Sequence, residues 1–368
     1  MTKNEGGAGP ENAEDEAAEG GDPAEKDATR RVTIYDVARE AGVAASTVSR
    51  TFARPGRVNA ETAEKIRAVA EALGYRTSSI PRAMRDEATK VLAFIAADVT
   101  NPVYGHMMRA FQNEALAGGY TTILLDSQED SLREQQLIQQ IIPLVDGLAL
   151  VASRLSDSAI SQVAKVIPVV VVNRAVAGIT SVVPDTMGGV RKAVEYLHSL
   201  GHMRLTYLSG PSASWIDGMR WRAATDICTS QGIHLRRVGP NIPTLRGGVA
   251  ATQLWKDHPT SAVLAYNDIM AIGFIKGAQS LGLRVPGDVS VIGIDNSMAS
   301  ILTTPTLTSV ATKSGDIGQR AAKTLIHHIS HRSEKLAPTI TVPTGIITRE
   351  STGNPTGAIS TDLLPDIH

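Results

Sequence analysis

From Val91 onward, short β-rich apolar runs alternate with stretches of helical periodicity, and this alternation constrains the fold more than any other feature. The apolar runs are VLAFIAA, TTILLD, DGLALVA, PVVVVN, RLTYLSG, AVLAY and VSVIGID. Helical spacing of apolar residues is found between them, over 107–116, 132–142, 187–200, 219–229, 246–255 and 269–281. The pattern predicts parallel sheets covered by helices on both faces. Roughly 260 residues of it are enough for two doubly wound subdomains.

Polar side chains follow four of the predicted strands at their carboxyl ends. They are Asp98 and Asn101, Asn173 and Arg174, Asn267 and Asp268, and Asp295 and Asn296. Ligands of open α/β sheets bind beyond the carboxyl ends of the strands. Strand ends also collect Asn and Asp because these side chains favour turns, so a turn role stays an alternative for each residue.

The segment SWIDGMRWR strengthens the ligand-binding interpretation. Trp215 and Trp221 supply flat apolar faces, and Arg220 supplies paired hydrogen-bond donors. A polyhydroxylated ring in a concave site needs this mixture.

A different pattern precedes the α/β region and predicts three short helices. Thr33 and Asp36 in TIYD fit an N-cap and its reciprocal partner, and they open a helix that ends at Gly42. After a Gly-Val turn, AASTVSRTF resumes helical spacing, and Asn59 caps a third helix in NAETAEKIRAVAEALG. Two short helices that meet at a tight turn containing glycine form a helix-turn-helix.

The second predicted helix exposes short side chains and one arginine, Arg50. Arginine matches the acceptors of guanine in the major groove, and small hydroxyls suit phosphates, so this surface is typical of DNA binding. A helical hairpin packed against another protein is the alternative.

The formal net charge of -1 hides strong segregation of charge. Over residues 1–29 acidic residues alternate with Gly, Ala, Asn and Pro, which predicts a disordered acidic tail because too little apolar surface offsets the ordering entropy. Over 30–90 basic residues outnumber acidic ones, which indicates a polyanionic partner or, alternatively, a solvated helical surface.

Composition and motifs exclude several classes of protein. No apolar run reaches the roughly 18 to 20 residues of a membrane span. The single cysteine, Cys228, cannot form an internal disulfide and falls inside a predicted amphipathic helix, where we expect it in the core. The N-terminus has no apolar segment behind a basic region, so we predict a cytoplasmic protein that is associated with the nucleoid when it is bound to DNA.

Enzyme motifs are missing from the sequence. No G-x-G-x-x-G follows a strand, there is no P-loop, and VIGID lacks a phosphate-cradling turn. His327, His328 and His331 have no HExxH glutamate beside them, so a solvated helix face explains them better than a metal site. We therefore predict no catalytic residues, no cofactor and no metal.

The segments VTIYDVAREAGVAASTVSRTF and VNAETAEKIRAVAEALGY closely resemble the head of the lactose-repressor (LacI/GalR) family of bacterial transcription regulators. The spacing matches over 32–75, and the resemblance continues to about Ser351. It implies an all-α helix-turn-helix head and a type I periplasmic-binding-protein-like α/β core of two doubly wound subdomains. The expected organisation is an acidic tail (1–29), a helix-turn-helix domain (30–76), a hinge helix and linker (77–90), an effector-binding and dimerisation domain (91–351) and a flexible tail (352–368).

By this resemblance the head contacts DNA through a defined set of residues. The base-reading positions are Ala45, Ser46 and Arg50 in the recognition helix and Arg57 in the loop after it, and the phosphate-holding positions are Tyr35, Thr47, Ser49, Asn59 and Thr62. The sequence departs from the family where Ala44 replaces a usual capping serine and Ala53 a frequent asparagine. Loss of the cap weakens a helix by about 1 kcal/mol.

The stretch SSIPRAMR occupies the position of the family's hinge, which becomes helical on the operator. Met84 matches the apolar residue that wedges into the minor groove, where such a side chain bends the duplex. With Ser78 as the cap, Pro81 lies in the first turn, where it removes no intrahelical bond. Packing of Met84 on a neighbouring domain is the alternative.

In the α/β region the resemblance implies that Asn173, Arg220, Asn267 and Asp295 hydrogen-bond a small effector and that Tyr104 lines its pocket. Asn101, which follows the first predicted strand, is a further candidate for this site. GPNIPTLRGG lacks the family's usual aromatic platform, and we expect Trp215 to stack on the ligand instead. The expected effector is a sugar, polyol or nucleoside, with purines, amino acids and phosphorylated metabolites as alternatives.

We therefore predict a homodimeric repressor that binds a pseudo-palindromic operator and is released from it by the effector. The tail STGNPTGAISTDLLPDIH contains no leucine heptad, which favours a dimer over a tetramer held by a coiled coil. The competing hypothesis is a stand-alone small-solute-binding or carbohydrate-metabolising protein, because the same core serves periplasmic binding proteins.

Overall fold

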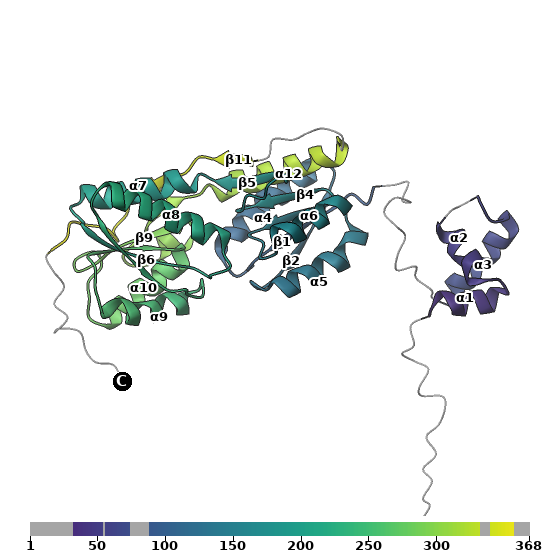
Figure 1. The fold of residues 1–368 in the computed structure, drawn as a ribbon, viewed down its shortest axis with the longest axis horizontal. Helices are drawn as coiled ribbons and strands as arrows, with labels where there is room; N and C mark the ends of the chain where they lie inside the picture. The colour runs from purple at the N-terminus through teal and green to yellow at the C-terminus, as the bar shows by residue number, and fades with distance from the viewer. Residues whose placement is uncertain (1–31, 54–55, 74–87, 332–338, 357–368) are drawn as a thin grey trace, which may run out of the picture. The chain divides into compact units, whose positions relative to one another are not determined.

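The computed structural model describes residues 32–53, 56–73, 88–331 and 339–356 (Figure 1). The chain divides into two compact units, Met1–Asp86 and Glu87–His368. The predicted acidic tail, Met84 and the last residues of the C-terminal tail lie outside the described residues. No helix within the described ranges is long and apolar enough to cross a bilayer.

Three helices form the first unit, which we call the head. They are α1 (Ile34–Ala41), α2 (Ala45–Ala53) and α3 (Ala60–Ala72). Their inward faces share one small core that includes Val37, Val48 and Ile66, each without solvent exposure. This arrangement confirms the predicted helix-turn-helix.

Local sequence signals position the ends of these helices. The Asp36 carboxylate accepts the Thr33 N–H at 2.9 Å and so satisfies a donor at the start of α1. Gly42 adopts φ 70° and ends the same helix in the left-handed conformation that glycine tolerates best. The Asn59 side chain accepts the Glu61 N–H at 3.0 Å and caps α3.

The second unit, which we call the core unit, contains two six-stranded sheets among its described residues. The first, in the order β11-β5-β4-β3-β1-β2, is built from β1 (Val91–Ala96), β2 (Thr121–Asp126), β3 (Gly147–Val151), β4 (Val169–Val172), β5 (Ser181–Pro184) and β11 (Thr339–Val342). The second, in the order β12-β10-β9-β8-β6-β7, is built from β6 (Arg204–Leu208), β7 (His234–Val238), β8 (Ala262–Ala265), β9 (Ser290–Asp295), β10 (Thr308–Ala311) and β12 (Gly345–Ile347). All pairings are parallel except that of β12 with β10.

Helices cover both faces of each sheet. The first sheet lies among α4 (Pro102–Ala117), α5 (Ser131–Ile141), α6 (Asp157–Val166) and α12 (Ser314–Ser330), with the short η2 (Ile142–Leu144) after α5. The second lies among α7 (Thr186–Ser199), α8 (Trp215–Ser230), α9 (Leu245–Lys256), α10 (Asp268–Ser280) and α11 (Ala299–Leu302). Alternate residues of β1 enter opposite cores, with Phe94 on one side and Ile95 on the other. The two subdomains are therefore doubly wound, as predicted.

All seven apolar runs form strands, whereas β5, β7, β10, β11 and β12 were not predicted. The buried Cys228 packs in the core beside α7, as expected. In β7, at the edge of its sheet, His234 is exposed and two arginines follow it, so it lacks the apolar signature of a central strand.

Three crossings of the chain join the subdomains, after β5, after β10 and after β11. Hydrogen bonds tie two of them together: the Asp185 N–H donates to the Val342 carbonyl at 2.8 Å, and the Thr344 hydroxyl donates to the Asp185 carbonyl at 2.8 Å. Lys192 donates to the Thr344 carbonyl at 2.7 Å. The crossings are therefore the segments about which the two subdomains can pivot.

Candidate functional sites

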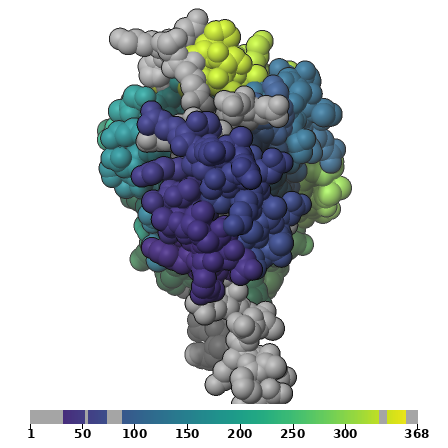
Figure 2. Space-filling view, turned by 90° about the vertical axis from the view of Figure 1, so that its right-hand side faces the viewer, coloured from purple at the N-terminus to yellow at the C-terminus, as the bar shows by residue number. Residues whose placement is uncertain are grey.

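The head presents the predicted DNA-contacting residues at its surface. Ser46, Ser49 and Arg50 of α2 are exposed, as are Tyr35, Arg57 and Asn59, while Ala45, Thr47 and Thr62 are half-buried. Figure 2 shows the atoms of the head as one continuous body, coloured purple to blue. Tyr35 is 72% exposed, so its ring and hydroxyl are accessible to a partner. The Asn59 oxygen already caps α3, so only its amide nitrogen is left to donate to another group.

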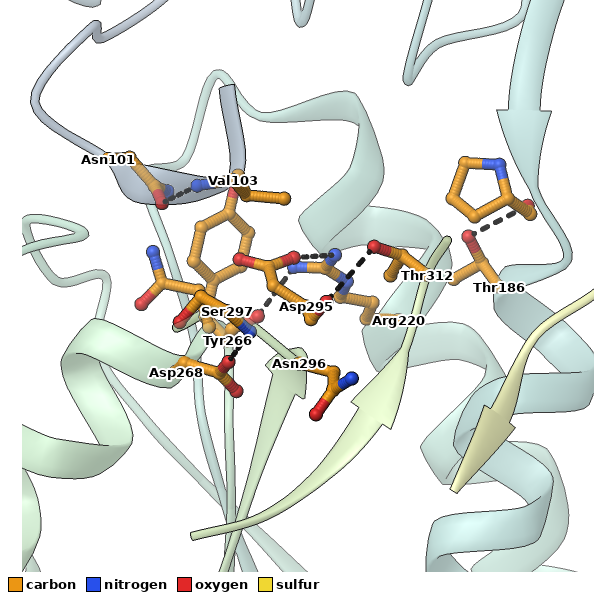
Figure 3. A network of polar contacts seen from close by, with 12 residues as sticks. Asn101, Val103, Thr186, Arg220, Tyr266, Asp268, Asp295, Asn296, Ser297 and Thr312 are labelled. Carbon is orange, nitrogen blue, oxygen red and sulfur yellow. Dashed lines mark hydrogen bonds and ion pairs between the residues drawn. The ribbon is translucent and has the colours of Figure 1, made fainter. Parts of the chain in front are cut away.

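The second candidate site lies at the carboxyl ends of the second sheet (Figure 3). Arg220 of α8 places Nη2 3.7 Å from Oδ1 of Asp295, which ends β9, and both side chains are less than 10% exposed. Nη1 of Arg220 donates to the Tyr266 carbonyl, and the guanidinium carbon is 4.9 Å from the centre of the Tyr266 ring. A buried ion pair adds little to stability compared with apolar packing, so its presence here favours a binding role.

The backbone at two strand ends adopts the left-handed region that non-glycine residues rarely enter. Asp295 has φ 128° and Asn296 has φ 53°, and Asn173, after β4, has φ 59°. Such conformations cost of order 1–3 kcal/mol each and cluster at ligand sites. The predicted Asn173 and Asp295 therefore both occupy conformations that the surrounding fold must impose.

Burial perturbs the carboxylates of this site. The pKa of Asp295 is raised to about 8, mainly by burial and further by the charge of Asp268. Arg220 opposes this rise. Burial also raises the pKa of Asp268 to about 6, although its carboxylate accepts the Ser309 hydroxyl at 2.6 Å and the Ser297 N–H at 2.7 Å. Hydroxyl groups of a ligand that donate to Asp295 would stabilise its charged form.

The first subdomain contributes the opposite wall. Tyr104 of α4 is buried, and burial followed by the nearby Tyr266 raises its pKa well above the usual value, with a smaller contribution from Asp295. The candidate site is therefore a buried polar layer between the two subdomains, which we call the seam.

Three other predicted residues also serve the local fold. Asn101 is buried and caps α4 by accepting the Val103 N–H at 3.2 Å. The Asn267 oxygen accepts the Met270 N–H at 2.9 Å and its nitrogen donates to the Pro243 carbonyl at 3.3 Å, so it caps α10. Trp215, the first residue of α8, is half-buried at the margin of the core around β8.

Trp221 does not supply the second flat face that was expected. Its ring centre is 5.9 Å from that of Tyr207, and the Arg237 guanidinium lies 5.2 Å from the Trp221 ring centre. The ring is engaged by neighbours within the second subdomain, which leaves Trp215 as the tryptophan near the strand ends.

Sequence reasoning missed Glu129, Arg154 and Tyr266. Glu129 follows β2 and Arg154 follows β3, so the strand-end rule applied to four other strands would have found both. Tyr266 directly follows β8 but lies in the apolar run AVLAY, where it gave no signal of a polar role.

The three histidines at the end of α12 and directly after it do not converge on one point. His327 and His331 stack with ring centres 4.4 Å apart, while Nε2 of His328 lies 3.0 Å from the Thr180 hydroxyl. Over the described ranges, no group of three or more His, Cys, Asp or Glu side chains is arranged to hold a metal ion.

Two family models match the chain. Residues 33–78 match the bacterial regulatory proteins of the lacI family, and residues 194–352 match the periplasmic binding protein-like domain.

Similar proteins cover most of the chain. It is 30% identical over 309 residues to catabolite control protein A of Priestia megaterium, covering 81% of this chain and 93% of that protein. It is 32% identical over 330 residues to the HTH-type transcriptional repressor PurR of Erwinia tasmaniensis, covering 87% and 96%. Among solved structures, a LacI family transcriptional regulator from Enterococcus faecium with bound ribose is 26% identical, with a TM-score of 0.65, covering 72% of this chain and 98% of that one.

Proposed function

This chain belongs to the LacI family of bacterial regulatory proteins, and from that premise we propose that it is a homodimeric repressor released from a pseudo-palindromic operator by a sugar-like effector. It is an effector-responsive DNA-binding regulator and not an enzyme. The family's head argues against a stand-alone solute-binding or carbohydrate-metabolising protein. Its DNA partner supports the proposal of a cytoplasmic protein that is associated with the nucleoid when it is bound to its operator.

The exposed surface of α2 supports the assignment of DNA contacts. Arg50 is free to reach base edges, and Ser46 and Ser49 are short enough to let the helix approach a groove closely. We assign the phosphate contacts to Tyr35, Thr47, Ser49, Asn59 and Thr62, and further base contacts to Ala45, Ser46 and Arg57. Met84 remains our candidate for the minor-groove wedge within a hinge over 77–90.

The main support for the effector site is the buried pair of Arg220 and Asp295. Asp295 ends its strand in the left-handed region, and the pair faces Tyr104 across the seam. A planar donor fork beside a carboxylate matches two neighbouring hydroxyls of a polyol, because each hydroxyl both donates and accepts. We assign Asn101, Asn173 and Asn267 to its polar lining and Trp215 to stacking. The similar structure with bound ribose supports a sugar among the candidate classes.

Ligand contacts from both walls of the seam would favour one arrangement of the subdomains over another. The pivot is at the three crossings, where Asp185 and Thr344 are hydrogen-bonded. An effector can bias this equilibrium only by its difference in affinity for the two arrangements.

We expect the effector to bind more weakly to the protein–operator complex than to the free protein. The physical reason is reciprocity: whatever factor the effector applies to operator affinity, the operator applies to effector affinity. Calorimetric titration of the effector into each form measures both dissociation constants. Equal constants would exclude the coupling, and tighter binding in the complex would establish co-repression in place of induction.

We expect Leu302→Asp to convert the dimer to a monomer. Three large apolar side chains on and beside α11, Met298, Ile301 and Leu302, are 69%, 53% and 76% exposed, and a cluster of exposed apolar groups, unlike a single one, marks an interaction surface. Light scattering measures the mass, and Leu132→Asp, at another exposed leucine, is the matched control that should stay dimeric. A wild-type tetramer at micromolar concentration would contradict the predicted dimer.

A further inference from the structure

We propose that Glu129 and Arg154 select the effector by charge: they form a neutral donor–acceptor pair at the strand ends of the first subdomain that admits an uncharged polyhydroxylated ligand and excludes its anionic analogue. The inference rests on the proposed effector site and names two further residues that determine its specificity.

The loops after β2 and β3 bring this pair together. Nε of Arg154 donates to Oε2 of Glu129 at 2.6 Å, and Nη1 donates to the Ala152 carbonyl at 3.1 Å. The Arg154 backbone is held as well, because its N–H donates to the Glu134 carboxylate at 2.8 Å. The Arg154 side chain is only 3% exposed, whereas its partner Glu129 is half-buried at 24%.

The backbone on both sides of the pair is in the left-handed region. Glu129 has φ 60°, and Ala152, two residues before Arg154, has φ 53°. Neither residue is a glycine, so the surrounding fold must stabilise both conformations. A simple brace between two loops would not require these conformations, and their presence after β2 and β3, the strands on either side of β1, indicates a positioned pair.

The pair faces the seam. The Glu129 N–H donates to the Ala97 carbonyl at 2.7 Å, in the loop after β1 that also carries Asn101, so the pair lies at the strand ends that line the seam. Tyr266 of the second subdomain and Tyr104 of the first lie near Arg154. The same two tyrosines are close to Arg220. Each subdomain therefore contributes an arginine and a partner carboxyl group to the seam.

One donor of Arg154 is left over. Nη2 is buried and in ion-pair contact with the Glu129 carboxylate, and its second hydrogen has no acceptor among the described residues. A buried N–H without an acceptor is costly, and a ligand hydroxyl could accept it while donating to a carboxylate oxygen. This combination suits a hydroxyl group, which has both a donor and an acceptor.

The balance of charge determines which ligand is rejected. Arg154 is already neutralised by Glu129, so a carboxylate or phosphate on the ligand would bring a second negative charge beside Glu129, next to the buried Arg154. Like charges placed together in this way disfavour the wrong partner strongly. Removal of the Glu129 charge would leave Arg154 with a net positive charge that an anionic ligand could neutralise.

The test uses the full-length protein and matched pairs of ligands, glucose with glucuronate and galactose with galacturonate, with ribose and cellobiose as further neutral sugars. Calorimetry and ligand-induced shifts of the melting temperature measure binding to wild type, Glu129→Gln and Glu195→Gln. Glu195→Gln makes the same charge change at an exposed residue of α7 and is the control. Acetate serves as the non-sugar anion.

We expect wild type and Glu195→Gln to bind the neutral sugar more tightly than the matching sugar acid. In Glu129→Gln the ratio of the two affinities should change by about 100-fold in favour of the acid, a size that coupling between close charges allows. The acid, and not acetate, should raise the melting temperature of Glu129→Gln. If Glu129→Gln is poorly folded, the double variant with Glu129→Gln and Arg154→Gln removes both charges. It should bind the neutral sugar, and its affinity for the sugar acid should not increase.

Two results would overturn the inference alone: wild type that binds sugar and sugar acid equally well, or a folded Glu129→Gln with the wild-type ratio. Wild type that binds a purine or an amino acid and none of the sugars would overturn the proposed effector class, and this inference with it.

Discussion

Arg220→Ala should abolish the response to effector while leaving operator binding without effector close to wild type. The side chain supplies the donor fork beside Asp295 and holds the Tyr266 carbonyl, and both of these groups are buried. Hydrogen bonds to charged groups contribute about 1.5–3 kcal/mol each, and Arg220 offers paired donors to the ligand, so we expect effector affinity to fall by about 100-fold or more. Calorimetry measures the affinity, and a gel shift with and without effector measures the response.

The fold should tolerate this substitution. Without Arg220, the remaining influences on Asp295, burial and the charge of Asp268, both raise its pKa, so the carboxyl group stays protonated near neutral pH and no unpaired charge is buried. Arg222→Ala is the matched control, because Arg222 is exposed on the same helix. A normal effector response in a folded Arg220→Ala protein would remove the seam as the effector site.

Arg50→Ala should relax operator discrimination without changing effector affinity. Arg50 is exposed on α2, and a bidentate contact between arginine and guanine is worth about 1–3 kcal/mol of discrimination against the wrong base. We therefore expect the ratio of operator to scrambled-DNA affinity to fall by roughly 5- to 150-fold, in line with that range. Titrations of both duplexes at one fixed salt concentration measure the ratio, because phosphate contacts make each affinity salt-dependent.

Arg67→Ala is the control for charge, since Arg67 is also exposed but lies on α3. Loss of a general electrostatic contact would weaken both duplexes by a similar factor and leave their ratio unchanged. The same behaviour in Arg50→Ala would show that Arg50 contacts the phosphate backbone and does not read bases.

Elements with local signals could be predicted from the sequence. The helices of the head begin and end where Thr33, Gly42 and Asn59 indicate, because caps and left-handed glycines act within one helical turn. The central strands were equally clear, since a strand buried on both faces has an uninterrupted apolar sequence. Edge strands such as β7 carry no such signal, because half of their side chains face solvent.

Single residues of the candidate site could be predicted from the sequence, whereas the contacts between side chains could not. The strand-end rule located Asn173 and Asp295, and the family resemblance located Arg220. It took the tertiary structure to show that Trp221 packs against Tyr207 and that Glu129 neutralises Arg154.

The sequence by itself determined the helix-turn-helix, the doubly wound core and the family, because these depend on periodicities and motifs within short segments. The tertiary structure decided which charged groups share the seam, since Arg154 and Tyr266 come from different subdomains and are brought together by the crossings of the chain. Burial and pairing set the charge and reach of each of these groups, and both are properties of the assembled fold, which no single segment contains.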